Sequence, residues 1–490
     1  MIIEQFYLGC LSHASYLIAD PVSKNAVIVD PQRDINQYLE EAKSQGLKIT
    51  HVFLTHVHAD FVAGHLELER KVGAKICLGE GTKANYDFQS CKDGDTISLG
   101  ENTSLKVIAT PGHTPEAISL LVYDLKNNKE KPYAVLTGDC LFIGDVGRPD
   151  LLASQGVTAN QLAGMLYDSL RNKLMPLPDE TLVYPAHGAG SLCGKNMSKD
   201  TVSSIGREKK TNYALKDMTK EKFISLITAD QPQMPKYFGY DASVNLSKHD
   251  TLDVVLERSL KPLTVDEVVQ QKNAGAYLLD GRESDAFAAK HVIDAISIPM
   301  KGHYATWAGT FLNHEKPVVI VAEPGTEREA ALRLGRIGFD RVVGYVKGGM
   351  SAFGERADLV STIKRETPST LETSMKSDKP PYVVDVRNDS EWNSGQIDGS
   401  VHLPLINLLE RVDSLPRDRQ LVILCATGNR SSTAASLLSQ RGVTQVTDLR
   451  GGIEAWKKLN LPVKQTVTSN TTAEVKAPTD ENTSKRDGKN

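Results

Sequence analysis

The 490-residue sequence lacks the features that mark membrane, secreted and disulfide-rich proteins. It has no run of about 18 apolar residues, so we expect no membrane span. Its start, MIIEQFYLGC, has no basic segment followed by an apolar one, so we expect no secretory signal. Its six cysteines are scattered, with no Cys-x-x-Cys pair. That spacing argues against a disulfide framework and fits a reducing cytoplasm, where we expect the protein to act.

An excess of charge of either sign is also missing. The net charge is -4, which gives no reason to expect nucleic acid or an anionic membrane as a partner. Apolar residues make up 40% of the chain and charged residues 24%, as in ordinary soluble globular proteins. The length exceeds what one core can organise, so we expect about two to four domains.

From residue 1 to about 240, short β-branched runs alternate with polar turns. Several of these predicted strands end in histidine or aspartate, as in ITHVFLTHVHAD (49–60), TPGHT (110–114), TGDC (137–140) and TLVYPAHG (181–188). Loops at strand ends commonly carry the chemistry of a rigid sheet. Several potential metal ligands are brought to strand ends in this way, which predicts a metal site. They are His56, His58, Asp60, His113, Asp139 and His187.

These strings, with GDVGRPDL (144–151), resemble the metallo-β-lactamase superfamily and, within it, the persulfide dioxygenases, also called sulfur dioxygenases. In two-metal members, the resemblance implies that the second metal takes Asp60, residue 61, Asp139 and His187. Residue 61 is Phe, which cannot coordinate a metal. A hydrolase that needs two metals is therefore disfavoured.

The resemblance implies that His56, His113 and Asp139 hold one Fe(II) per chain. Two imidazoles and one carboxylate are the ligand set of non-haem Fe(II) oxygenases. His58, Asp60 and His187 would then orient the ligands or meet the substrate. The implied reaction oxidises a low-molecular-weight persulfide with O₂ to sulfite and a thiol. A mononuclear zinc hydrolase with His58 as a third histidine ligand is the alternative.

Other residues near these motifs are candidates for holding the substrate. Arg148, in GDVGRPDL, is expected to bind the thiol carrier. Arg207, Lys209 and Lys210 either do the same or form a solvated face. Cys193 either carries sulfur near the metal or is a buried loop thiol.

From about residue 260 the sequence repeats itself. YLLDGRESDAFAAKHVIDAISIP (277–299) parallels YVVDVRNDSEWNSGQIDGSVHLP (382–404), and the segments that follow, 318–353 and 421–456, also correspond. Each copy alternates strand and helix patterns, which predicts a small parallel α/β domain. The repeat unit is too long for a solenoid, so we expect a duplicated domain.

In the second copy, LVILCATGNRSSTAA (421–435) predicts a buried strand, Cys425, a tight loop and a helix. The loop amides and the helix start would lower the thiolate pKa and hold an anion, which makes Cys425 a nucleophile rather than a buried core cysteine. This copy resembles the rhodanese sulfurtransferases, which implies a Cys425 persulfide, with Gly428 and Arg430 in the substrate loop. A Cys-dependent phosphatase is less suitable, because the loop between Cys425 and Arg430 is short.

The first copy has VAEPGTERE in the same place. Ala322 occupies the nucleophile position, and Glu323, Glu327 and Glu329 would put negative charge around an anion cradle. We therefore expect an inactive rhodanese-like domain that serves as a spacer or a docking surface.

Together the patterns predict a multidomain α/β chain with an αββα metallo-β-lactamase fold and two rhodanese-like domains. The expected order is a dioxygenase domain (1–240), a linker (241–262), an inactive rhodanese-like domain (263–360), a linker (361–380), an active rhodanese domain (381–465) and a disordered tail (466–490). Cys425 would pass persulfide sulfur to sulfite and give thiosulfate, in a process of sulfide detoxification. Exposed apolar surface between linked domains makes a homo-oligomer our expectation.

Two other functions stay open. One is a glyoxalase II-type thioester hydrolase fused to a sulfurtransferase, and the other is a non-catalytic protein that only relays sulfur. The thiol carrier is also open, because no motif separates glutathione, coenzyme A and bacillithiol.

Overall fold

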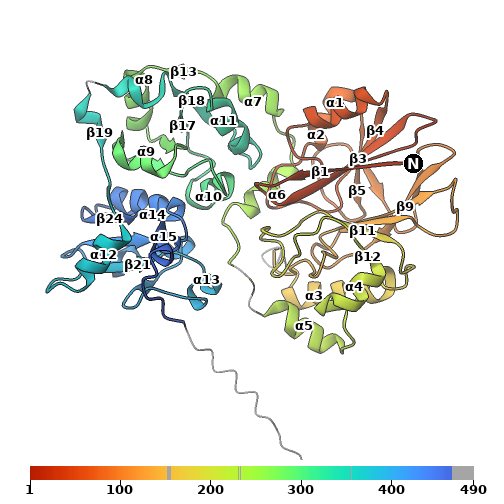
Figure 1. The fold of residues 1–490 in the computed structure, drawn as a ribbon. Coiled ribbons are helices and arrows are strands. Elements are labelled where there is room, and N and C mark those ends of the chain that lie inside the picture. The colour runs from red at the N-terminus through yellow and green to blue at the C-terminus, as the bar shows by residue number, and fades with distance from the viewer. Residues whose placement is uncertain (152–155, 230, 232, 355, 466–490) are drawn as a thin grey trace, which may run out of the picture.

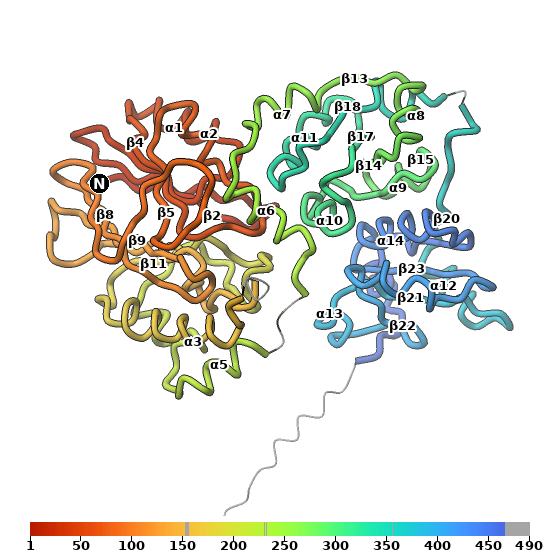
Figure 2. Tube along the Cα trace, turned by 180° about the vertical axis from the view of Figure 1, so that it is seen from behind, coloured from red at the N-terminus to blue at the C-terminus, as the bar shows by residue number. Residues whose placement is uncertain are grey.

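The computed structural model describes residues 1–151, 156–229, 231, 233–354 and 356–465. The expected disordered tail at 466–490 lies outside the described residues. Figures 1 and 2 show three bodies: the first half of the chain, drawn from red to yellow-green, a middle domain in green to teal, and a last domain in blue.

Two six-stranded sheets form the first domain within the described residues. The first sheet has the order β1 (Ile2–Leu8), β2 (His13–Ala19), β3 (Asn25–Val29), β4 (Lys48–Phe53), β5 (Lys75–Gly79), β6 (Gln89–Cys91). The second has the order β12 (Ser203–Ser204), β11 (Leu182–Pro185), β10 (Ala134–Gly138), β9 (Ile118–Asp124), β8 (Thr103–Ala109), β7 (Thr96–Ser98).

Helices cover the outer faces of these sheets (Figure 1). Those on the first sheet are α1 (Asn36–Ser44) and α2 (His65–Val72), and those on the second are α3 (Ala159–Ser169), α4 (Ile205–Thr211) and α5 (Lys220–Thr228). Between the sheets lies a buried apolar cluster that includes Ile18, Val27, Val107, Leu120 and Leu136. Burial of such side chains is the main favourable term in the stability of the fold. The predicted αββα architecture is confirmed.

The middle and last domains each contain a five-stranded parallel sheet in the described residues, and the strands follow one pattern. In the middle domain the order is β13 (Pro262–Leu263), β18 (Val342–Val346), β17 (Val318–Val321), β14 (Tyr277–Asp280), β16 (Ile296–Ser297). In the last domain it is β20 (Lys364–Glu366), β24 (Val446–Leu449), β23 (Leu421–Leu424), β21 (Tyr382–Asp385), β22 (Val401–His402). The predicted pair of parallel α/β domains is confirmed.

Helices flank both sheets (Figure 1). In the middle domain they are α8 (Val265–Asn273), α9 (Ser284–Ala289), α10 (Tyr304–Phe311) and α11 (Glu327–Gly335). In the last domain they are α12 (Pro368–Met375), α13 (Asp389–Asn393), α14 (Asn429–Gln440) and α15 (Gly452–Lys458). α14 packs against β16 and α9, so the helix that follows Cys425 faces the middle domain.

Both segments that we expected as linkers contain regular structure. Residues 241–262 hold the end of α6 (Phe238–Asn245) and all of α7 (Leu252–Ser259). In 361–380, β20 pairs with β24 in parallel and α12 follows it. The Thr367 side chain caps α12, Pro368 occupies its first turn and Leu371 is buried. Residues 364–375 of this segment therefore belong to the last domain and are not a linker.

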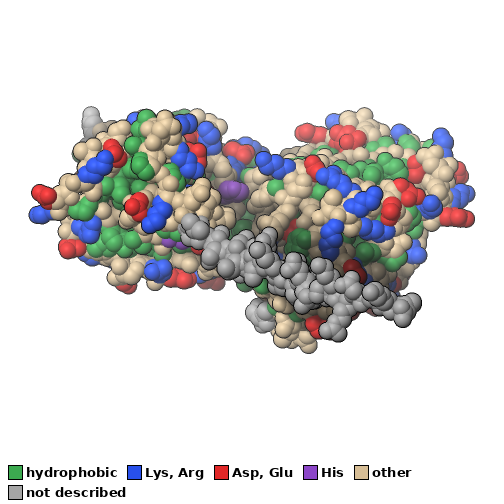
Figure 3. Space-filling model, turned by 60° about the horizontal axis from the view of Figure 1, so that its bottom comes forward, with side chains coloured by type: hydrophobic (Ala, Val, Ile, Leu, Met, Phe, Trp, Pro, Cys, Tyr) green, Lys and Arg blue, Asp and Glu red, His purple; other side chains and the backbone are tan. Residues whose placement is uncertain are grey.

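The surface carries charges of both signs. On the face drawn in Figure 3, basic and acidic side chains are interspersed. Among the helices of the described ranges, none combines the length and the apolar character that crossing a bilayer requires.

Candidate functional site

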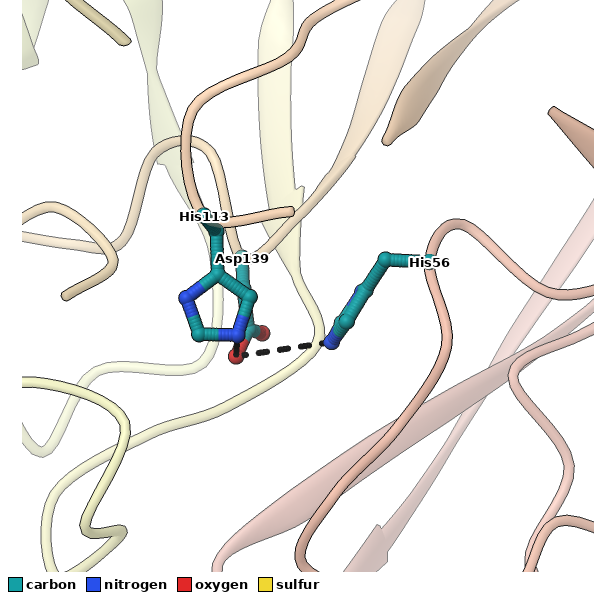
Figure 4. A group of neighbouring side chains, drawn as sticks. All are labelled: His56, His113 and Asp139. Carbon is teal, nitrogen blue, oxygen red and sulfur yellow. Dashed lines mark ion pairs between the residues drawn. The ribbon is translucent and has the colours of Figure 1, made fainter. Parts of the chain in front are cut away.

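Three strand-end side chains converge in the first domain. His56 follows β4, Asp139 follows β10, and His113 lies in the turn between β8 and β9. Asp139 Oδ2 is 3.7 Å from His56 Nε2 and 3.4 Å from His113 Nε2, and all three residues are buried (Figure 4). One ligand atom of each lies within 4.8 Å of the others, so the three can share a metal ion.

The protonation states of these groups suit a metal. Burial lowers the pKa of both His56 and His113, which keeps the imidazoles neutral. Burial opposes ionisation of Asp139, but the neighbouring His187, His56 and His113 outweigh it and hold its pKa well below the usual range. Neutral imidazole and ionised carboxylate are the forms that bind metal.

Outer hydrogen bonds orient both imidazoles. His113 Nδ1 donates to the carbonyl of Arg148 at 2.8 Å. His56 Nδ1 lies 3.0 Å from Thr55 Oγ1, which donates its own proton to Asp30 at 2.8 Å, so the histidine is the donor. Metal-binding histidines characteristically donate their second nitrogen in this way. Both Nε2 atoms are therefore left to face Asp139.

The other predicted site residues form a second group. His187 lies between Asp139, at 2.8 Å from Nδ1, and Asp60, at 2.9 Å from Nε2. Burial disfavours a charged His187, but the two carboxylates prevail and hold its pKa well above the ordinary value. Cys193 completes a group with Asp60 and His187 that could also hold a metal. Burial, reinforced by the nearby carboxylates, raises the pKa of the Cys193 thiol, which keeps it protonated.

Phe61 and His58 contact each other and lie outside both candidate ligand groups. The Phe61 ring is fully buried and packs against the rings of His13 and His58, with centroids 4.3 and 4.5 Å away. His58 Nε2 is 2.9 Å from Asp30 Oδ1, so this nitrogen is occupied by a carboxylate. The structure does not bring His58 into either candidate ligand group.

The expectation that Arg148 binds the thiol carrier is not supported by the structure. Its side chain is 1% exposed, and its guanidinium forms two 2.7 Å bonds with Asp150 and one with the Leu192 carbonyl. Arg148 instead contributes the backbone carbonyl that holds His113. Of the surface candidates, Arg207 pairs with Asp200 and Lys209 with Asp179.

Asp30 is a residue that the sequence analysis overlooked. It is 1% exposed and accepts hydrogen bonds from the Thr55 amide and hydroxyl and from His58, so it holds the start of the loop that carries His56. The signal was present, since Asp30 ends the strand in NAVIVD as Asp139 ends the strand in AVLTGD.

The Cys425 loop forms a second site in the last domain. Cys425 follows β23 and is 1% exposed. The Gly428 amide donates to its Sγ at 3.1 Å, and Ser431 Oγ lies 3.5 Å away. Gly428 has φ +112°, a conformation that favours glycine and turns its amide inward. Amides directed at sulfur at a helix start stabilise a thiolate.

Arg430 is held beside this loop. Its guanidinium forms bonds of 2.6 and 2.7 Å with Glu391, the residue whose side chain completes the capping box of α13. In the middle domain the equivalent strand β17 is followed by Ala322, whose side chain is no nucleophile.

Comparisons with known proteins agree with this architecture. The family model of the metallo-beta-lactamase superfamily matches residues 8–187, and that of the rhodanese-like domain matches 264–356 and 367–459. A crystal structure of a metallo-beta-lactamase from Staphylococcus aureus subsp. aureus COL covers 70% of this chain and 98% of its own, with a TM-score of 0.61 and 31% identity.

Two classes of enzyme are similarly related to the first domain. The mitochondrial persulfide dioxygenase ETHE1 of Bos taurus is 31% identical over 232 residues, which are 47% of this chain and 81% of the relative. A hydroxyacylglutathione hydrolase of Brucella anthropi is 32% identical over 253 residues, 51% of this chain and 86% of the relative. Identity alone therefore does not separate oxidation from hydrolysis.

Proposed function

Because the chain belongs to the metallo-beta-lactamase superfamily and continues into two rhodanese-like domains, we propose that it couples a persulfide dioxygenase to a sulfurtransferase. The first domain would convert a low-molecular-weight persulfide, O₂ and water into a thiol and sulfite. The last domain would transfer persulfide sulfur to sulfite and release thiosulfate.

One observation supports oxidation over two-metal hydrolysis. By the resemblance, a second metal would need Asp60, Asp139, His187 and a donor at position 61. Phe61 has no donor atom, and Asp60 and His187 form an ion pair with each other. The remaining set of His56, His113 and Asp139 suits one Fe(II) with open positions for substrate and O₂.

In this proposal the protein residues bind, orient and shield. His56, His113 and Asp139 would hold Fe(II), which supplies the redox chemistry for O₂. Arg148, through its carbonyl, and Thr55 keep the imidazoles in the tautomer that coordinates. The fully buried Phe61 ring packs against His58, whose ring in turn lies beside His56.

At Cys425 the thiolate would attack the outer sulfur of a persulfide. The S–S bond of the substrate breaks, the thiol leaves, and a Cys425 persulfide forms, stabilised by the Gly428 amide. Sulfite then attacks the outer sulfur of this persulfide. Thiosulfate leaves and the Cys425 thiolate is restored, with Arg430 beside the loop to attract the anion.

The alternative of a hydroxyacylglutathione-type hydrolase is supported by the similar identity of those relatives and by the second donor group of Asp60, His187 and Cys193. It requires a metal there although Phe61 offers no ligand.

A metal count combined with an oxygen electrode separates the two functions. The chain is purified without oxygen, its iron and zinc are measured, and a small persulfide is added. One iron per chain with persulfide-dependent O₂ uptake supports the proposal, and thiosulfate should form unless Cys425 is changed to Ser. Two zinc ions, no O₂ uptake and turnover of an acylglutathione would instead identify a hydrolase.

A further inference from the structure

The loop that carries His56, His58 and Asp60 is held partly from outside the two sheets. Asn245, the last residue of α6, is 1% exposed. Its Nδ2 donates to the carbonyls of His58 and Phe61, both at 2.8 Å, and its Oδ1 accepts from the Ala63 amide at 2.8 Å. Both N–H donors and the oxygen of the Asn245 carboxamide therefore form hydrogen bonds with the loop.

The middle domain holds the adjacent amide of the same loop. The Val62 amide donates to the carbonyl of Arg336 at 2.8 Å, at the C-terminal end of α11. α6 lies between the first and middle domains in both views (Figures 1 and 2). Two successive amides of the loop are thus bound from outside the sheets. The Val62 amide is bound by the middle domain, and the Ala63 amide by α6, the helix that precedes that domain.

Two ion pairs, one in each direction, hold the middle domain against the first domain. Arg336 binds Asp34 of the first domain at 2.8 and 2.7 Å. In the opposite direction, Arg33 of the first domain binds Asp340 at 2.6 and 3.0 Å. Arg33 is fully buried and also bonds the Gly335 carbonyl at 2.7 Å. Two-pronged pairs of arginine with carboxylate fix orientation as well as contact, so the middle domain docks in one pose.

Close packing reinforces the same contact. Tyr237 precedes α6, and its ring lies so near Gly309 of α10 that an added Cβ there would be 2.5 Å from it. The Tyr237 hydroxyl is 3.5 Å from the Asp60 carbonyl. The middle domain therefore contacts this loop through Tyr237 as well as through Arg336.

We propose that the middle domain and α6 together are the positioning element of the metal-binding loop. Through Asn245 and the Arg336 carbonyl they would set the place of His56 and hence the metal affinity of the site. The proposal relies on the proposed function only in taking this site to bind a metal. It gives a role in the first domain's chemistry to a rhodanese-like domain that has no nucleophile of its own.

The test measures metal affinity in the full chain, without persulfide or O₂. Metal-free protein is titrated with Co²⁺ and the visible spectrum is followed. Asn245→Ala should weaken Co²⁺ binding about 10- to 100-fold, the usual effect of losing a group that orients ligands. The control is Tyr86→Phe, which removes a 2.7 Å bond to the Asn245 carbonyl but leaves the carboxamide intact. This control should lose some thermal stability and bind Co²⁺ as the unchanged protein does.

A second variant keeps the test decisive if Asn245→Ala fails to fold. Asp340→Asn weakens the Arg33 pair from the middle domain, far in sequence from any ligand. It should weaken Co²⁺ binding and speed hydrogen exchange at Val62 and Ala63, while exchange in β17 stays unchanged. Normal Co²⁺ affinity with unchanged exchange of these two amides in Asp340→Asn would overturn the proposal, as would normal affinity in folded Asn245→Ala.

The outcome is independent of the reaction itself. A chain that consumes no O₂ but loses Co²⁺ affinity in these variants would contradict the dioxygenase proposal and leave this one standing. O₂ uptake with unaltered Co²⁺ affinity would do the reverse.

Discussion

Gly452 is the position where a single methyl group should separate the two proposed activities. Gly451 and Gly452 begin α15, whose Ile453 and Glu454 amides donate to the carbonyls of Cys425 and Ala426 at 2.9 and 3.1 Å. Gly452 has φ +57°, and an added Cβ would lie 2.3 Å from the Cys425 carbonyl oxygen. Since ordinary contact begins at 3.4 Å, Gly452→Ala must move the loop by about 1.1 Å.

A displacement of about 1 Å at a reacting group can cost about 100-fold in rate. We therefore expect Gly452→Ala to lower thiosulfate formation from persulfide and supplied sulfite by about that factor. O₂ uptake should stay unchanged, because the candidate metal ligands lie in another domain. The two rates are measured on one preparation, with thiosulfate quantified by chromatography and O₂ by electrode.

Gly442→Ala is the matched control. Gly442 has φ +74°, with nothing within 4 Å of an added Cβ, so the variant carries the same backbone strain without the clash. That strain amounts to about 1–2 kcal/mol, and both variants should lose melting temperature accordingly. If Gly452→Ala makes thiosulfate as fast as Gly442→Ala does, the idea that α15 sets the geometry of the Cys425 loop is wrong.

Three further predictions address the rest of the chain. His113→Ala should lose bound metal and O₂ uptake while transfer at Cys425 persists with supplied sulfite; retention of metal and uptake would remove His113 from the site. Arg33→Ala leaves the buried Glu67 carboxylate without its cation, so urea unfolding should show a loss of about 3–5 kcal/mol, and a loss below about 1 kcal/mol would refute the account. Burial raises the pKa of the Asp241 carboxyl well above its ordinary value, so the folded chain holds the proton of this carboxyl more tightly than the unfolded chain does. The stability that this group contributes is full below its unfolded pKa and is lost as the pH rises through the folded value. Asp241→Asn should therefore flatten the decline in melting temperature as the pH rises above about 4, where the carboxyl of the unfolded chain ionises, and an unchanged slope would mean that another group titrates.

The sequence was sufficient to single out the candidate residues for chemistry. Histidines and aspartates at the ends of predicted strands indicated a metal site, because loops at strand ends commonly carry the chemistry of a rigid sheet. Cys425 was identified because a buried strand, a tight loop and a helix start form a local pattern. Both predictions depend on neighbours in the chain, which a sequence displays directly.

The segments between domains were harder to predict. We expected residues 361–380 to be a linker, yet they supply β20 and α12 to the last domain. Arg148 was expected at the substrate because its motif lies beside the ligands, whereas its side chain is buried against Asp150. In both cases the outcome depends on which distant groups pack nearby, and residue type alone does not specify them.

What the sequence by itself determined is the set of candidate donors, the candidate nucleophile and the duplicated fold, since the first two are marked by short local motifs and the third by a repeated pattern of segments. Only the tertiary structure decided how those donors are used. It paired His187 with Asp60 and turned His58 toward Asp30. It also joined Asn245 and Arg336 to the loop of residues 58–63, although both lie far from that loop in the chain. Hydrogen bonds and ion pairs of this kind depend on distances of about 3 Å between remote groups, and those distances exist only after the sheets and domains have packed.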